Sequence, residues 1–164
     1  EYRKLLGVRL YGCDSCQEVC PYNQGQLHKD RCVGGKRPVG EHVGEYGDVA
    51  GREFKPSEDS DQDLLKLVAM TEQEFNNTYG NKAFGWRGHT VLQRNAIVAL
   101  GNSESPHVCE TLKCLLENPI SVIRAHAVWA LSQYRPSWFS DTVQRMLETE
   151  KDSDVLKELH GAAG

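Results

Sequence analysis

The pattern that decides the fold reads VLQRNAIVAL at residues 91–100 and returns as VIRAHAVWAL at residues 122–131, 31 residues later and without a gap. In both copies the apolar residues lie three and four positions apart, which is the period of an amphipathic helix. The residues that follow each copy keep the same offset. The matching apolar positions are Val108, Leu112, Leu115 and Leu116 in one unit and Phe139, Val143, Met146 and Leu147 in the next. We therefore predict a repeating unit of two helices.

The boundaries of the unit are also visible in the sequence. Pro119 favours the start of a helix, and Gly101 favours the end of the helix that closes with Leu100. A third copy begins near Asp154 and is incomplete. Helix pairs of this kind bury their apolar faces only by stacking on neighbouring pairs, as in α-solenoids. We predict a mainly α protein with a HEAT-like helical repeat domain over residues 61–164.

Two shorter helices are expected ahead of the repeat. Leu64, Leu65, Leu67 and Val68 give one apolar side to a helix that begins near Asp61. Thr71 followed by Glu74 is a capping box, which predicts a second helix running through Phe75 and Tyr79. Residues 24–60 hold seven glycines and many charges with no apolar period, so we expect a linker or a long surface loop there.

Charge is distributed unevenly along the chain. The net charge is −4 over 164 residues, which by itself disfavours nucleic acid as a partner. Residues 41–74 carry −7, whereas residues 1–40 and 82–137 each carry +3. Because binding depends on local charge, a basic face on an acidic chain can still meet phosphates. No run of eighteen apolar residues occurs, so we expect no membrane span, and a cytoplasmic location is the default in the absence of a leader segment.

The cysteine stretch lies in residues 11–23, which read YGCDSCQEVCPYN. Cys13, Cys16 and Cys20, followed by proline, match the last three positions of a bacterial ferredoxin run, in which the final cysteine ligates a second cluster. Leu10 stands where the first ligand would be. We therefore expect Cys13 and Cys16 to bind one cluster, Cys20 to bind another, and the missing ligands to precede Glu1. A zinc site is the rival interpretation, although no second Cys-x-x-Cys is present.

The remaining candidate groups are expected to be structural. Cys109 and Cys114 are predicted to be buried thiols, and Cys32 is left open as a stray ligand. Trp86, Trp129 and Trp138 are predicted to pack in the core or between repeats, with base-stacking platforms as the alternative. His89 and His126 are predicted to be packing or surface residues and not ligands.

A cysteine head joined to a helical repeat resembles the epoxyqueuosine reductase family. The stretches that carry the resemblance are residues 11–23, residues 87–102 (RGHTVLQRNAIVALGN) and residues 126–131 (HAVWAL). The resemblance implies an oxidoreductase that converts epoxyqueuosine to queuosine in tRNA. It also implies two [4Fe–4S] clusters and a cobalamin cofactor. On this basis the chain is expected to be a C-terminal fragment, with a ferredoxin-type segment at residues 1–23 and with the catalytic cobalamin domain missing.

The same resemblance assigns site residues. Cys13 and Cys16 match the cluster nearer cobalamin, Cys20 matches the other cluster, and Asp14 is a candidate cobalamin contact. The helical repeat matches the part of the family that lies beside the tRNA anticodon arm. The candidate tRNA-binding residues are Arg87, Arg94, Asn95 and Arg124. An electron donor such as flavodoxin or ferredoxin is a further expected partner, and a monomer is expected.

Two other functions fit parts of the pattern. An electron-transfer module of another cobalamin enzyme, such as a relative of the reductive dehalogenases, would share the cysteine motif but would not need a repeat tail. A HEAT-like scaffold without enzymatic activity, holding zinc or no metal, would explain the repeat alone. Asn95 and Arg94 could likewise bridge neighbouring helices instead of touching RNA.

Overall fold

The computed structural model describes residues 2–11 and 58–164. Within these ranges the chain is helical and contains no strand, which confirms the mainly α prediction for the described part. The longer helices are α1 (Tyr2–Leu6), α4 (Glu58–Ala69), α5 (Glu72–Tyr79), α6 (His89–Gly101), α7 (Cys109–Cys114), α8 (Ser121–Tyr134), α9 (Phe139–Thr149) and α10 (Ser153–Ala163). Short 3-10 turns lie at η1 (Gly85–Arg87), η2 (Pro106–Val108) and η3 (Leu115–Glu117). None of the described helices is both long and apolar enough to cross a membrane.

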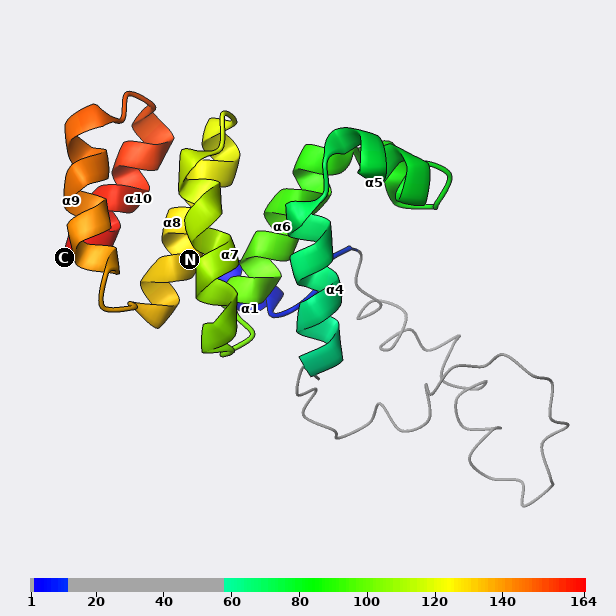
Figure 1. The fold of residues 1–164 in the computed structure, drawn as a ribbon, viewed down its shortest axis with the longest axis horizontal. Helices are drawn as coiled ribbons and strands as arrows, with labels where there is room; N and C mark the ends of the chain where they lie inside the picture. The colour runs from blue at the N-terminus through cyan, green and yellow to red at the C-terminus, as the bar shows by residue number, and fades with distance from the viewer. Residues whose placement is uncertain (1, 12–57) are drawn as a thin grey trace, which may run out of the picture. The chain divides into compact units, whose positions relative to one another are not determined.

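The helices of residues 58–164 pack in two layers. In one layer α6 packs against α8, and α8 packs against α10. In the other layer α4 covers α6, α7 with η3 covers α8, and α9 covers α10. The pairs therefore stand in a row, as Figure 1 shows from α4 and α6 through α7 and α8 to α9 and α10. The predicted two-helix unit corresponds to one outer and one inner helix.

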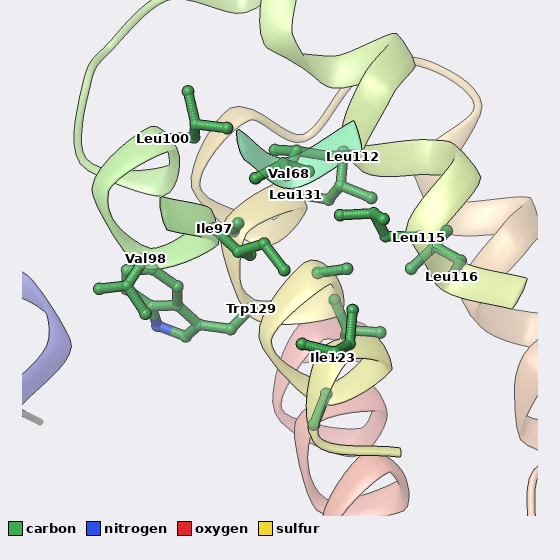
Figure 2. Close-up of a cluster of buried hydrophobic side chains, with 14 of the residues drawn as sticks. Val68, Ile97, Val98, Leu100, Leu112, Leu115, Leu116, Ile123, Trp129 and Leu131 are labelled. Atoms are coloured by element: carbon green, nitrogen blue, oxygen red, sulfur yellow. The ribbon is translucent and has the colours of Figure 1, made fainter. Parts of the chain in front are cut away.

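The two copies of the sequence pattern occupy α6 and α8. Leu100 and Leu131, which close the two copies, are both fully buried. Around them lies an apolar cluster, part of which Figure 2 shows with labelled residues from α4, α6, α7, η3 and α8. Its labelled members are Val68, Ile97, Val98, Leu100, Leu112, Leu115, Leu116, Ile123, Trp129 and Leu131. Each fully buried side chain of this size stabilises the fold by about 1.5–3 kcal/mol relative to its exposed state.

Gly101 has a packing role that differs from the predicted one. It is the last residue of α6, and Asn102 is the capping position. A Cβ atom on Gly101 would lie 2.7 Å from Cζ3 of Trp129 and 3.0 Å from Cα of Ala130. Because real side chains do not approach that closely, glycine at this position lets α6 and α8 meet.

The predicted helix boundaries, before the repeat and within it, agree with the structure to within a few residues. Thr71 and Glu74 form the expected capping box, with the Thr71 backbone N–H donating to Glu74 Oε2 at 2.8 Å. Helix α4 begins at Glu58, three residues before the predicted start. Helix α8 begins at Ser121, two residues after Pro119, and the Asp152 carboxylate caps α10 by accepting from the Asp154 and Val155 backbone N–H groups.

Candidate nucleic-acid interface

The N-terminal segment of residues 2–11 is fastened to α6 by two asparagine side chains. Nδ2 of Asn102 donates to the carbonyl oxygens of Arg3 at 3.0 Å and Gly7 at 2.9 Å. Nδ2 of Asn95 donates to the carbonyl oxygen of Leu10 at 2.9 Å. The carbonyls at a helix end have no partner inside the helix, so side-chain amides are suitable donors to the end of α1. We call these contacts the asparagine latch.

The side chain of Arg3 links the same segment to the next two inner helices. Its guanidinium pairs with the Glu158 carboxylate on α10. Its Cζ atom also lies 5.3 Å from the ring centroid of Trp129 on α8. Residues 2–11, which the sequence assigned to the cysteine head, therefore pack with the helices of residues 58–164.

Asn95 and Arg94 form one hydrogen-bonded unit. Nε and Nη2 of Arg94 donate to Oδ1 of Asn95 at 3.2 and 2.9 Å. Both polar atoms of the Asn95 side chain are thus engaged inside the protein, which favours the bridging interpretation for this residue. Arg94 makes no ion pair with any described residue. Its positive charge therefore lacks a carboxylate partner in this part of the chain.

Arg124 is held by the protein on three sides. Its Nε and Nη2 atoms donate to the two carboxylate oxygens of Glu150 at 2.8 and 2.9 Å. Its Nη1 atom donates to the carbonyl oxygens of Asn118 at 2.8 Å and Pro119 at 3.2 Å. The hydrogen bond from Arg124 lowers the pKa of Glu150 to about 2. This arrangement joins α8 to the end of α9 and leaves Arg124 little capacity for an external phosphate.

Trp86 and Arg87 lie in η1, between α5 and α6. The Arg87 Cζ atom lies 4.1 Å from the Trp86 ring centroid, which is a cation–π contact. Trp86 is 69% exposed, so the prediction that it packs in the core is wrong. The same prediction is confirmed for Trp129, which is 4% exposed, and Trp138 packs against Phe139 with their ring centroids 6.4 Å apart. Like Arg94, Arg87 makes no ion pair with a described residue.

His89 and His126 behave as packing residues. Burial lowers the pKa of His126, and the charges of Arg3 and Arg94 lower it further, against the opposing effects of Val122 and Glu158. Its Nδ1 atom lies 2.7 Å from the Val122 carbonyl oxygen. The His89 ring packs on Phe75, with their centroids 5.4 Å apart. Across residues 2–11 and 58–164 no group of three or more His, Cys, Asp and Glu side chains is placed to hold a metal.

The two described cysteines differ. Cys109 is buried as predicted, and burial raises the pKa of its thiol. Cys114 is exposed, so the prediction of a buried thiol is wrong there. The predicted cluster ligands Cys13, Cys16 and Cys20, the predicted cobalamin contact Asp14, and Cys32 lie outside the described residues.

Comparison with known proteins shows what the chain is similar to. No family model matches it. It is 35% identical to an epoxyqueuosine reductase of Listeria monocytogenes over 161 residues and 32% identical to one of Bacillus subtilis over 164 residues. Each match covers 97% of this chain. The chain spans somewhat more than a third of these relatives, 37% and 36% of their lengths.

Solved structures give the same result. A crystal structure of epoxyqueuosine reductase with an epoxyqueuosine-modified tRNA-Tyr stem loop matches with a TM-score of 0.71 at 30% sequence identity. That match covers 99% of this chain and 38% of the other. An epoxyqueuosine reductase from Streptococcus thermophilus matches with a TM-score of 0.69 at 27% identity.

Proposed function

Because the chain is related over nearly its whole length to epoxyqueuosine reductases, we propose that it is the C-terminal part of an enzyme that reduces epoxyqueuosine to queuosine in tRNA. The observation that carries the proposal is the reach of the similarity, since a match over 97% of the chain spans the cysteine stretch and the helices alike. A scaffold protein would account for the helices alone, and an electron-transfer module would account for the cysteines alone.

The role proposed for the helices is to bind the tRNA anticodon arm. The row of helix pairs, with its repeated α6 and α8 patterns, supports a HEAT-like repeat as the fold of this part. Two arginines without a carboxylate partner among the described residues, Arg87 and Arg94, are the proposed phosphate contacts. Arg124 and Asn95 were also predicted from the sequence, but their contacts inside the protein favour structural roles. A related structure that holds a tRNA stem loop supports the choice of partner.

The role proposed for the cysteine stretch is to ligate iron. Three thiolates at this spacing, with proline after the last, match three of the four cysteine ligands in a ferredoxin run. We propose that Cys13 and Cys16 bind one [4Fe–4S] cluster and that Cys20 binds a second, with Asp14 beside cobalamin. The clusters would supply electrons and cobalamin would supply the reducing chemistry at the epoxide. The remaining ligands and the cobalamin domain are proposed to belong to a longer protein.

The split assignment of the cysteines has a direct test. In the full-length protein purified without oxygen, we expect about eight irons per chain, as two [4Fe–4S] clusters require. Cys16→Ala and Cys20→Ala should each lose iron but should remove different electron paramagnetic resonance signals. Loss of the same signal in both variants would contradict the split, and zinc in place of iron would contradict the redox function.

The activity itself can be tested with the purified full-length protein. A tRNA stem loop carrying epoxyqueuosine is incubated without oxygen with a strong reductant, and its nucleosides are analysed by mass spectrometry. We expect conversion to queuosine, a loss of one oxygen atom in mass. A protein that contains its clusters and leaves epoxyqueuosine intact would overturn the proposal.

A further inference from the structure

The loop between α5 and α6 presents an aromatic ring outward. Trp86 is 69% exposed, although tryptophan is a residue that globular proteins mostly cover. The backbone is closely packed at the residue before it, because a Cβ atom on Gly85 would lie 2.1 Å from the Tyr79 carbonyl oxygen. The Gly85 N–H also donates to the Lys82 carbonyl oxygen at 2.9 Å. Trp86 therefore directly follows a tight turn, and its ring is exposed.

A cation lies against this ring, and further cations are near it in the sequence. The guanidinium of Arg87 stacks on the indole, with Cζ 4.1 Å from the ring centroid. Residues 80–94 contain Lys82, Arg87 and Arg94 and no Asp or Glu. An open aromatic surface beside uncompensated positive charge is the combination that single-stranded nucleic-acid sites use, in which bases stack on rings and cations meet the phosphates.

Ring contacts also connect this loop to the N-terminal segment. Phe84, two residues before Trp86, lies 5.9 Å from Tyr11 and 5.6 Å from Tyr79, measured between ring centroids. Tyr11 directly precedes the cysteine stretch in the sequence. The loop is thus anchored to the part of the chain that leads into the proposed redox region.

We infer that Trp86 is a stacking platform for an unpaired nucleobase of the tRNA, and that Arg87 orients the indole and contacts the phosphate beside that base. This inference rests on the proposed function and adds to it a specific residue for loop recognition. Every base has a flat face, so stacking favours unpaired over paired nucleotides and does not by itself select the base.

The test uses the full-length protein and two RNAs with the same number of nucleotides, an anticodon stem loop with epoxyqueuosine and a two-stranded duplex with no unpaired nucleotide. Trp86→Ala should weaken binding of the stem loop by about 5- to 100-fold, which is the usual effect of losing one stacked base. Trp86→Phe should recover part of the affinity. Neither change should alter binding of the paired duplex.

Salt dependence separates stacking from charge. Trp86→Ala should leave the slope of log affinity against log salt unchanged, because no cation is lost. Arg87→Gln should flatten that slope by about 0.7, the contribution of one phosphate contact on a single strand. The matched control is Lys113→Gln, since Lys113 also stacks on a tryptophan, with Nζ 4.5 Å from the Trp138 ring, but lies in the outer layer on α7. We expect no change for the control.

Each outcome decides between the two proposals. If the unaltered protein does not bind the stem loop, the proposed function fails. If the unaltered protein binds but Trp86→Ala binds equally well, the stacking platform is overturned and the proposed function stands. An equal loss for both RNAs would also overturn it, because the residue would then support the fold or a backbone contact. Capture of an apolar peptide by this loop, with no RNA effect, would assign the site to a protein partner.

Discussion

At the scale of single residues, the contacts of Arg124 and Arg94 indicate different roles for the two side chains. Arg124 aligns with Gln93 in the 31-residue repeat. Both side chains donate to backbone carbonyls that follow or end an outer helix, Gln93 to Val68 at 2.8 Å and Arg124 to Asn118 at 2.8 Å. The shared role marks this as a structural position of the repeat. Arg94 aligns with Ala125 instead, and alanine has no polar side chain. The repeat therefore gives no structural reason for a positive charge at Arg94.

The pairing of Glu150 with Arg124 predicts a pH-dependent contribution to stability. Glu150 is 9% exposed and its pKa is lowered from an ordinary 4.5 to about 2. Since its folded pKa lies below its unfolded value, the stabilisation is complete above about 4.5 and is lost as the pH falls through about 2. Glu150→Gln should lower the free energy of unfolding at pH 7 by about 1.5–3 kcal/mol. Urea unfolding should show this difference shrinking as the pH falls from 5 toward 2.

Glu148→Gln is the control for this change, because Glu148 is exposed on the same helix. It should alter the free energy of unfolding by less than about 0.5 kcal/mol. An equally large effect at both positions would mean that general charge, and not the contact with Arg124, stabilises this region.

At the scale of elements, the close approach of α6 and α8 depends on Gly101. Gly101→Ala would force a Cβ atom against Trp129 and Ala130, and we expect a loss of about 1–3 kcal/mol in the free energy of unfolding. Gly161→Ala is the matched control within α10, since its Cβ would meet nothing within 4 Å. That change should be neutral or stabilise by up to about 1 kcal/mol. Thermal unfolding that ranks the two variants the other way would contradict the packing.

The asparagine latch makes a prediction about the N-terminal segment. Asn102→Ala removes two hydrogen bonds, to the carbonyls of Arg3 and Gly7, which contribute about 0.5–1.5 kcal/mol each. In the full-length protein, trypsin should then cut faster after Lys4 and Arg9. Gln133→Ala is the control, because Gln133 is exposed and, among the described residues, its side chain bonds only to Trp129 and Ser132 of the same helix, α8. Unchanged cleavage in Asn102→Ala would show that other contacts hold the segment.

The sequence was sufficient to predict the helices but not to predict which side chains lie on the surface that the helices form. Apolar spacing placed α6 and α8, and the capping box placed α5, because these signals are local. The sequence did not show that the Asn95 and Asn102 side chains would donate to backbone carbonyl oxygens 85 to 99 residues earlier, since those contacts exist only after folding. The prediction that Trp86 is buried was wrong for a related reason. Its segment has no helical period, and the exposure of the ring is visible only in the folded loop.

At the scale of the whole molecule, the net charge does not reveal the local positive charge of the proposed binding surface. The chain carries −4, yet the stretch of residues 80–94 holds three cations and no acid. The acidic residues are concentrated in residues 41–74, which carry −7. An overall acidic protein can therefore bind RNA through one local surface, with a salt dependence set by the few cations that face the phosphates.

The relatives to which the chain is similar are about three times its length, and the proposed reaction belongs to such a longer protein. The most direct test is therefore made in cells. The gene is deleted, total tRNA is digested, and its nucleosides are measured by mass spectrometry before and after the full-length gene is restored. We predict that epoxyqueuosine accumulates without the gene and that queuosine returns with it. Queuosine levels unaffected by the deletion, in cells with no second enzyme of this kind, would contradict the assignment.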